Sequence, residues 1–290
     1  MRPTFLMTDP GHFRVAYEIN PWMRPGDWSA DPAAHDAAAR SGWQSLKRAL
    51  EGAGAEVTVM PGEAGLPDLV FPANAAVVLD GRALVAHFRY PERAGETPHF
   101  HRALERLTGI AMVTDIEGVY QEGAGDCIWD ANRRLFWVAS GPRSSPDSVK
   151  VISDFFGQET VHMPLATKAY YHLDTCFCPL SGGEILYYPP ALSEVALAAL
   201  QAHTSADQRI EATDADARAF CVNAVSLGRK LIMARPGAEL HDRLSARGYD
   251  VIGIDLDPYL LSGGGAFCMT LRLDLVSQPA PAARCLEAAA

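Results

Sequence analysis

The stretch CIWDANRRLFWV at residues 127–138 places two short apolar runs on either side of a polar turn. Runs rich in Ile, Trp, Phe and Val that flank such a turn predict a β-hairpin. The pattern recurs along the chain, and each hairpin leads to a helical segment and a return strand. Hairpins are predicted at 69–85, 127–138, 176–188 and 221–233, and a fifth is predicted to start at Cys268 and to be completed by N-terminal strands at 5–7 and 15–19.

The repeated unit predicts a closed ring. The hairpins begin 45 to 58 residues apart, which is typical of propeller-like and other repeat folds. We therefore expect five ββαβ modules in a single α/β domain over residues 1–275, followed by a frayed tail at 276–290. Helical spacing of apolar residues predicts helices at 36–52, 193–202 and 238–247, and short strands are expected at 56–60 and 250–254.

The composition limits the choice of partner. The chain has 290 residues, 48% of them hydrophobic and 21% charged, which is enough for a sizeable core. No run approaches the ~20 apolar residues of a membrane span, and the segment after Met1 lacks the apolar region of a signal peptide. A formal charge of −10 without a Lys/Arg cluster argues against nucleic acid and membrane partners and favours a small cationic or neutral substrate. We expect a cytoplasmic protein, and a homo-oligomer is left open.

The cysteines fall into two groups. None of the six has zinc-site spacing, and most lie in apolar runs, which indicates reduced thiols. Cys127, Cys176, Cys221 and Cys268 are expected at equivalent places, at the start of the first strand of a module and facing the axis. The first three are interpreted as core packing, because free cysteine is commonly buried. Cys268 alone follows a glycine triplet, at 263–265.

Cys268 is the candidate nucleophile. Glycines before it allow the backbone to approach a ligand closely. A thiol with an ordinary pKa of ~8.5 is mostly protonated at neutral pH, so a catalytic cysteine needs a nearby base, cation or cationic substrate. His172 is the candidate base, and Asp174 shares its face in an extended chain. With the motif EGAGD at 122–126, these residues predict a Cys/His/carboxylate site assembled by the fold.

These motifs and the five-module plan together resemble the guanidine-modifying enzyme superfamily, the penteins. It includes arginine deiminases, dimethylarginine dimethylaminohydrolases and amidinotransferases. The resemblance spans residues 5 to about 275. The segments INPWM at 19–23, PDLVFPANA at 67–75 and YHLDTCFCPL at 171–180 look most like the arginine dihydrolase branch.

The resemblance implies a five-bladed α/β propeller, the pentein fold, with its site at the axis and no metal or organic cofactor. Cys268 would attack the central guanidinium carbon. His172 would protonate the departing amine and then activate water against the S-alkylthiouronium intermediate. Glu122 would orient His172 and stabilise its charge.

The resemblance also implies substrate contacts. Asp68 and Asp174 would pair with guanidinium nitrogens through charge-assisted hydrogen bonds. Arg143 matches the position that binds a substrate carboxylate, and Asn20 would line the same pocket. Asp126 lies four residues after Glu122 instead of the three of the deiminase pattern, so its role is left open.

Asn74 stands where deiminases resemble one another in having an aspartate. In the family, asparagine here accompanies dihydrolase chemistry, in which arginine passes through a citrulline-like stage to ornithine, carbon dioxide and two molecules of ammonia. A neutral amide both donates and accepts hydrogen bonds, so it would hold a neutral ureido group as well as a cation. Arginine dihydrolase is therefore the leading hypothesis.

Three alternatives stay open at this stage. The first is a dimethylarginine dimethylaminohydrolase or arginine deiminase that gives citrulline. The second is an amidinotransferase that passes the amidino group to an amine. The third is a non-catalytic binder of guanidino compounds, which the joint presence of Cys268, His172, Glu122 and Asp174 disfavours. In each case the partner is a small guanidino compound, with a guanidino amino acid as the expected substrate.

Overall fold

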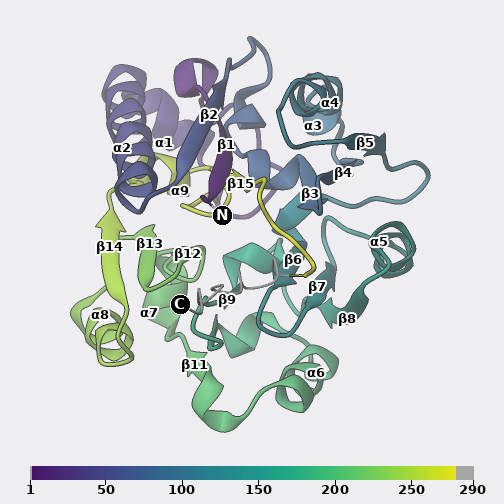
Figure 1. The fold of residues 1–290 in the computed structure, drawn as a ribbon. Helices are drawn as coiled ribbons and strands as arrows, with labels where there is room; N and C mark the ends of the chain where they lie inside the picture. Colours follow the sequence, from purple (N-terminus) through teal and green to yellow (C-terminus); the bar gives the residue numbers. More distant parts are fainter. Residues whose placement is uncertain (1, 279–290) are drawn as a thin grey trace, which may run out of the picture.

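Five small sheets surround a central axis (Figure 1). The computed structural model describes residues 2–278. Each sheet has three strands, and the predicted five-module α/β propeller is confirmed. The sheets contain β15 (Leu271–Arg272), β1 (Thr4–Thr8) and β2 (Glu56–Met60); β3 (Ala76–Leu79), β4 (Arg82–Val85) and β5 (Met112–Asp115); β6 (Cys127–Asp130), β7 (Leu135–Ser140) and β8 (Glu159–Pro164); β9 (Phe177–Pro179), β10 (Ile185–Tyr187) and β11 (Arg209–Glu211); and β12 (Val225–Leu227), β13 (Lys230–Ala234) and β14 (Asp250–Ile254).

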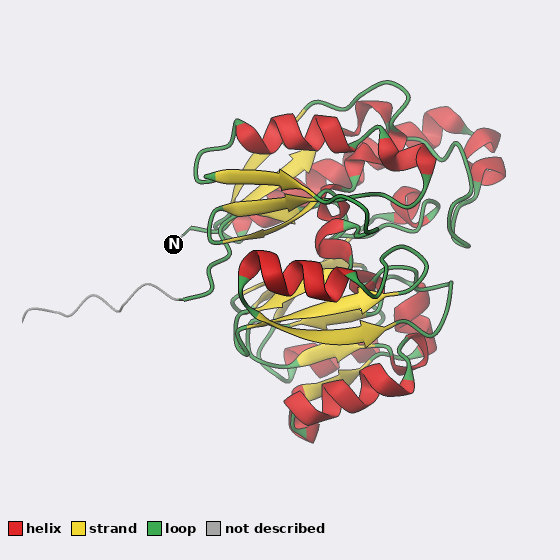
Figure 2. Ribbon diagram, turned by 90° about the vertical axis from the view of Figure 1, so that its right-hand side faces the viewer, coloured by secondary structure: helices red, strands yellow, loops and turns green. Residues whose placement is uncertain are grey.

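Every module repeats one topology. The first two strands pair antiparallel, and the third pairs parallel with the middle strand. A parallel pair needs a crossover connection, which a helix supplies here. These helices cover the outside of the ring (Figures 1 and 2), and the three predicted helices are confirmed to within a few residues. The crossover helices are α2 (Pro32–Gly52), α4 (Thr97–Glu105), α5 (Ser148–Phe156), α6 (Glu194–His203) and α8 (Ala238–Ser245), and the shorter ones are α1 (Pro25–Ala30), α3 (Pro91–Ala94), α7 (Asp214–Arg218) and α9 (Asp257–Leu260).

The fifth module closes the ring with both ends of the described chain. β15 pairs antiparallel with β1, and β1 pairs parallel with β2, as the sequence predicts. The predicted strand at 15–19 is wrong, because this segment pairs with none of the described strands. Val15 and Ile19 are buried in the core instead, and the Ile19 carbonyl accepts a hydrogen bond from Arg143 (3.2 Å).

The first hairpin also differs from the prediction. Residues 67–70 form the 3-10 helix η2 (Pro67–Val70), and the first strand is β3. Pro67 and Pro72 lack the N–H group that a strand ladder needs and fix φ near −65°, which excludes a strand between them. The predicted turn at Asp80-Gly81 is confirmed, with φ of 54° and 69°, the left-handed pair of a tight hairpin.

The predicted equivalence of the four cysteines is wrong. Cys127 begins β6, whereas Cys176 precedes β9 by one residue, Cys268 precedes β15 by three and Cys221 precedes β12 by four. The chain still turns at Cys221, because Phe220 before it has a φ of 56°. Cys127, Cys176 and Cys221 are buried, which confirms their role in packing. The five described cysteines are free thiols, and Cys285 lies outside the described residues.

A short turn precedes the first strand of each module. The turn is the 3-10 helix η3 (Pro72–Asn74) before β3, η4 (Gly123–Gly125) before β6 and η5 (Leu173–Thr175) before β9. Segments 220–224 and 265–270 take the corresponding places before β12 and β15. η3 contacts η4, and η4 contacts η5. Side chains from five distant parts of the sequence therefore meet at one end of the axis.

The start of the predicted tail is attached to the first module. The Ser277 N–H donates to the Asp80 carboxylate (2.8 Å). Residues 279–290 of that tail lie outside the described residues. Within residues 2–278, no helix has both the length and the apolar character needed to cross a membrane.

The closure of the ring gives a stability prediction. Phe5 is 2% exposed on β1 and pairs with Arg272 of β15, so Phe5→Ala leaves a cavity where the ring closes. We expect a loss of about 3–5 kcal/mol in the free energy of unfolding, measured by urea denaturation. The matched control is Val59→Ala on β2, which is 39% exposed and is expected to change stability by less than about 0.5 kcal/mol. Equal effects of the two variants would contradict a buried closure.

Candidate active site

The turns before the first strands carry the predicted site residues. Asp68 and Asn74 belong to η2 and η3, Glu122 and Asp126 flank η4, and His172 and Asp174 belong to the η5 turn. Cys268 lies in the turn before β15. The fold brings these residues together from positions 200 residues apart in the sequence.

The Cys268 thiol lies between two polar side chains. It is 2% exposed, donates to Asp174 Oδ2 (3.1 Å) and accepts from Asn223 Nδ2 (3.1 Å). Burial, and after it the Asp174 charge, raises the pKa of the Cys268 thiol well above its usual range. Without a cation nearby, Cys268 is therefore a protonated thiol at neutral pH.

Asn223 is a site residue that the sequence analysis missed. Besides the contact with sulfur, its Oδ1 accepts from the backbone N–H groups of Phe267 (2.9 Å) and Cys268 (3.1 Å). It also has a recognisable place in its module, because it lies two residues before β12 as Asn74 lies two residues before β3. That shared offset is visible only when the strand starts are known.

His172 is held by Glu122. The distance from His172 Nε2 to Glu122 Oε2 is 2.8 Å, and both side chains are fully buried. Burial alone would raise the pKa of Glu122, but the positive charges of Arg143 and His172 outweigh it and the pKa is lowered. Glu122 is therefore an ionised acceptor, which places the proton of a neutral His172 ring on Nε2.

Arg143 is the second partner of Glu122. Its Nη1 donates to Oε2 of the same carboxylate (2.9 Å), and its guanidinium lies 4.8 Å from the ring centres of both Tyr90 and Tyr171. Arg143 is 1% exposed, and its Nε has no partner within the described residues. The structure thus pairs Arg143 with the Glu122 carboxylate, and its contact with a substrate carboxylate stays a prediction.

Asp126 connects the turns of Glu122 and His172. Its Oδ1 accepts from the backbone N–H of Leu173 (3.0 Å), and its Oδ2 accepts from the Ser144 hydroxyl (2.6 Å). Ser144 in turn accepts from the backbone N–H of Glu122 (3.1 Å). The open question about Asp126 therefore has a structural answer, since this carboxylate fixes the backbone on both sides of the Glu122 to His172 contact.

Asp68 and Asn20 both contact Ser262, in the loop before Cys268. Asp68 accepts from the hydroxyl groups of Tyr17 (3.0 Å) and Ser262 (3.3 Å), and burial raises the pKa of its carboxyl group. Asn20 Nδ2 donates to the backbone carbonyl of Ser262 (3.1 Å), while its Oδ1 accepts from the N–H of Trp22 (2.9 Å). The segment at 15–20 is thereby attached to the loop before Cys268.

Asn74 packs directly against His172. Its Nδ2 lies 3.4 Å from His172 Nδ1, and it is 2% exposed. A Cβ atom on Gly125 would lie 2.2 Å from that Nδ2, so glycine in the EGAGD motif is required for the two turns to come this close.

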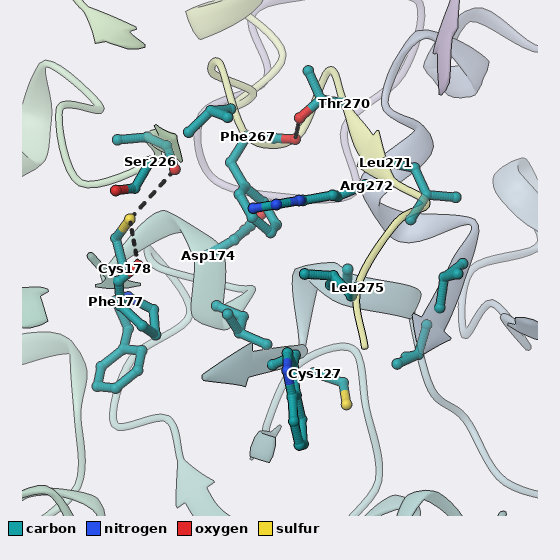
Figure 3. A pocket seen from close by; sticks show the side chains of 18 of the residues that line it. Cys127, Asp174, Phe177, Cys178, Ser226, Phe267, Thr270, Leu271, Arg272 and Leu275 are labelled. Atoms are coloured by element: carbon teal, nitrogen blue, oxygen red, sulfur yellow. Dashed lines mark hydrogen bonds between the residues drawn. The ribbon is translucent and has the colours of Figure 1, made fainter. Parts of the chain in front are cut away.

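Asp174 contacts the Cys268 thiol and also lines a cavity. A cavity of about 100 Å³ lies between the first strands of the modules, and Cys127, Cys178 and Leu271 line it together with Asp174 (Figure 3). Asp174 Oδ1 is buried and has no partner within the described residues. Burial raises the pKa of Asp174 to about 7, although Cys268 and Asn223 lower it. This free oxygen suits an N–H donor of a cationic ligand.

Sequence comparison places this geometry in a known family. The family described as "N,N dimethylarginine dimethylhydrolase, eukaryotic" matches residues 12–275. The chain belongs to this family of guanidino-modifying hydrolases. The family's fold, the pentein propeller, is the one described above.

Relatives in this family have different stated activities. The bifunctional arginine dihydrolase/ornithine cyclodeaminase ArgZ of Synechocystis sp. is 35% identical over 268 residues, which cover 92% of this chain and 37% of ArgZ. The N(G),N(G)-dimethylarginine dimethylaminohydrolase of Mycobacterium tuberculosis is 34% identical over 269 residues, 93% of this chain and 85% of that protein. The chain thus spans less than two fifths of its bifunctional relative.

Solved structures of an arginine dihydrolase and of a dimethylarginine dimethylaminohydrolase have the same fold as this chain. A Cys-to-Ser variant of the N-terminal domain of ArgZ, bound to its substrate, superposes with a TM-score of 0.88 at 33% identity and covers 95% of this chain and 100% of that domain. A dimethylarginine dimethylaminohydrolase adduct with 4-chloro-2-hydroxymethylpyridine has a TM-score of 0.74 at 21% identity, over 94% of this chain and 100% of that one. The second match concerns the fold alone.

The contact between Asn223 and the thiol gives a prediction. Asn223→Asp keeps the acceptor for the two backbone N–H groups, removes the donor to sulfur and adds a negative charge beside it. The pKa of Cys268 should rise further, so alkylation by iodoacetamide at pH 8 should slow at least about tenfold. Cys268→Ala measures the labelling of the other cysteines. An unchanged alkylation rate would remove Asn223 from the control of the thiol.

The Asp126 carboxyl group gives a pH prediction. Burial raises its pKa to about 6, although His172 and Ser144 lower it. The folded state therefore binds the proton more tightly than the unfolded state, and this stabilisation is complete below about pH 4 and is lost as the pH rises through 6. The free energy of unfolding of the wild type minus that of Asp126→Asn should fall by up to about 3 kcal/mol between pH 4 and 7. A constant or rising difference would contradict the assignment.

Proposed function

We propose that the chain hydrolyses arginine to ornithine, carbon dioxide and two molecules of ammonia through a covalent Cys268 intermediate. The observation that carries this proposal is the neutral amide of Asn74 beside His172 (3.4 Å), in a site that otherwise holds a thiol and carboxylates. A carboxylate there would favour only a cation, whereas an amide also suits an uncharged ureido group. The similarity to arginine dihydrolases over nearly the whole chain supports the same assignment.

The first half of the reaction depends on the positive charge of the guanidinium group. A guanidinium group enters between Asp68 and Asp174, where Asp174 Oδ1 lacks a partner. Its positive charge lowers the pKa of Cys268, so the thiol passes its proton to His172 and the thiolate forms a C–S bond to the guanidinium carbon. His172 protonates the departing amine as the C–N bond breaks, and ammonia leaves. His172 then takes a proton from water, which attacks the thiouronium carbon and releases citrulline and the thiol.

The second half repeats these steps on the ureido group. Cys268 attacks the ureido carbon, a second ammonia leaves, and an S-carbamoyl intermediate remains attached to the ornithine nitrogen. A second water breaks the C–S bond and gives the carbamate of ornithine, which loses carbon dioxide. One arginine and two waters thus become one ornithine, two ammonia and one carbon dioxide. Glu122 stabilises the imidazolium form of His172 in both halves, because its carboxylate lies 2.8 Å from Nε2.

A second candidate function is hydrolysis of methylated arginine to citrulline. The match of residues 12–275 to the dimethylarginine family and the similarity to the M. tuberculosis enzyme favour it. The two candidates share Cys268, His172 and Glu122, and differ in the leaving amine and in the fate of citrulline. The products therefore decide between them.

The deciding assay supplies arginine, citrulline, monomethylarginine and dimethylarginine separately and measures ornithine, citrulline, ammonia and methylamines. We expect ornithine and two ammonia per arginine from the wild type, and citrulline in place of ornithine from Asn74→Asp, because a carboxylate holds the ureido group poorly. Cys268→Ala should reduce turnover by at least about 10³-fold.

Other outcomes would overturn the proposal in distinct ways. Ornithine from wild type and Asn74→Asp in the same yield would remove Asn74 from the mechanism. Turnover of methylated arginines alone would establish the second candidate. A new guanidino product when an amine is added would indicate a transferase, and full activity of Cys268→Ala would exclude a covalent mechanism.

A further inference from the structure

Arg93 is a buried arginine beside the site that the mechanism does not use. It lies on α3 and is 3% exposed. Its Nε and Nη2 donate to the two carboxylate oxygens of Glu96, both at 2.8 Å, and the ring of Phe88 lies 4.6 Å from its guanidinium carbon. A two-bonded arginine–carboxylate pair fixes the plane of the guanidinium as well as its position. Glu96 is fully buried, so its carboxylate is shielded from bulk solvent.

The remaining donors of Arg93 reach the substrate side of the site. Nη1 donates to Asn74 Oδ1 (2.9 Å), and Nη2 donates to the backbone carbonyl of Asp68 (3.2 Å). An arginine side chain has donors and no acceptor, so it selects the oxygen end of the Asn74 amide. The NH₂ end is thereby turned toward His172 Nδ1.

The opposite orientation of the amide is unfavourable on both sides. A flipped Asn74 would direct its NH₂ group at the N–H donors of Arg93 and leave buried donors without acceptors. The amide also has little room, since Gly125 packs against its Nδ2. Glu96 therefore fixes Arg93, and Arg93 fixes the direction in which the Asn74 amide faces.

We propose that Glu96 is a positioning residue for the ureido half of the reaction. Through Arg93 it holds the Asn74 NH₂ group on the His172 side of the site, 3.4 Å from Nδ1. There this N–H donor would match the oxygen of a bound ureido group, whereas a guanidinium offers no matching acceptor. The pair thus selects for the second hydrolysis and contributes less to the first. This inference rests on the proposed function, because only a ureido substrate offers the oxygen that the Asn74 NH₂ group would bind.

The test is Glu96→Gln, which keeps the size of the side chain and one acceptor for Arg93 but removes the charge and the second contact. Arginine and citrulline are supplied separately, and kcat and KM are measured for each. We expect kcat/KM for citrulline to fall at least about tenfold more than that for arginine, with citrulline accumulating from arginine. The matched control is Glu105→Gln, at the end of α4, the helix that begins directly after Glu96. The Glu105 side chain is 57% exposed, and its substitution should leave both values unchanged.

A double variant separates positioning from general damage. In an Asn74→Asp background there is no amide to orient, so adding Glu96→Gln should change the residual kcat/KM for citrulline less than twofold. Equal losses for both substrates, or the same effect of Glu96→Gln in both backgrounds, would overturn the proposal. If Glu96→Gln does not fold, Arg93→Lys serves instead, because it keeps the charge and loses the planar fork; it should show the same selective loss for citrulline.

A measurement without substrate keeps this inference distinct from the proposed function. In protein with ¹⁵N-labelled histidine, wild-type His172 should show the tautomer with its proton on Nε2, and Glu96→Gln should shift the Nδ1 signal that faces Asn74. Identical His172 signals in the two proteins would overturn the positioning role, whatever the substrate proves to be. Failure of the wild type to use citrulline, with the expected shift present, would overturn the proposed function alone.

Discussion

The Glu122 carboxylate is the interaction on which the site depends. One of its oxygens accepts from both His172 (2.8 Å) and Arg143 (2.9 Å), and the other accepts from the backbone N–H of Arg89 (3.1 Å). These partners come from three different modules, so a single buried anion joins neighbouring parts of the ring. An unpaired carboxylate at this depth would be strongly destabilising, and the two cationic partners offset that cost. The contacts that orient His172 are consequently among those that hold neighbouring modules together.

The five-module ring explains how distant residues form one site. Each module enters its first strand through a turn near the axis, and every turn contributes one or two polar side chains. The strands behind the turns supply the apolar support, because their residues are buried on both faces. The turns carry a thiol in one module (Cys268), an imidazole in another (His172) and an amide two residues before the strand in two more (Asn74 and Asn223). The candidate site residues therefore lie in the turns before the first strands, whereas the sheets and helices of the modules repeat one topology.

Much of this arrangement could be predicted from the sequence. The alternation of apolar runs and polar turns predicted five modules, and the motifs around Cys268, His172 and Glu122 predicted the central site. The strand at 69–71 was wrong because the prolines at 67 and 72 outweigh an apolar tripeptide. The equivalence of the cysteines was wrong because the turns before the strands differ in length. Local sequence patterns predict the spacing of the modules and the positions of the turns. They do not predict at which residue the first strand of each module begins.

Contacts between side chains of different modules could not be predicted from local sequence patterns. Asn223 and Arg93 have no motif that marks them, and their roles arise only when their modules lie side by side. The pairing of Arg143 with Glu122 is of the same kind, because nothing in the sequence near either residue indicates the other. Predicting these contacts requires the relative rotation of the modules, which is set by packing of the whole ring.

The pairing of β15 with β1 has a consequence for the order in which the protein becomes functional. During synthesis the fifth module has only β1 and β2 until β15 emerges, and Cys268 is three residues before that strand. Cys268 therefore emerges after every other residue of the candidate site, directly before the strand that closes the ring. The last segment of the described fold thus completes both the ring and the set of site residues.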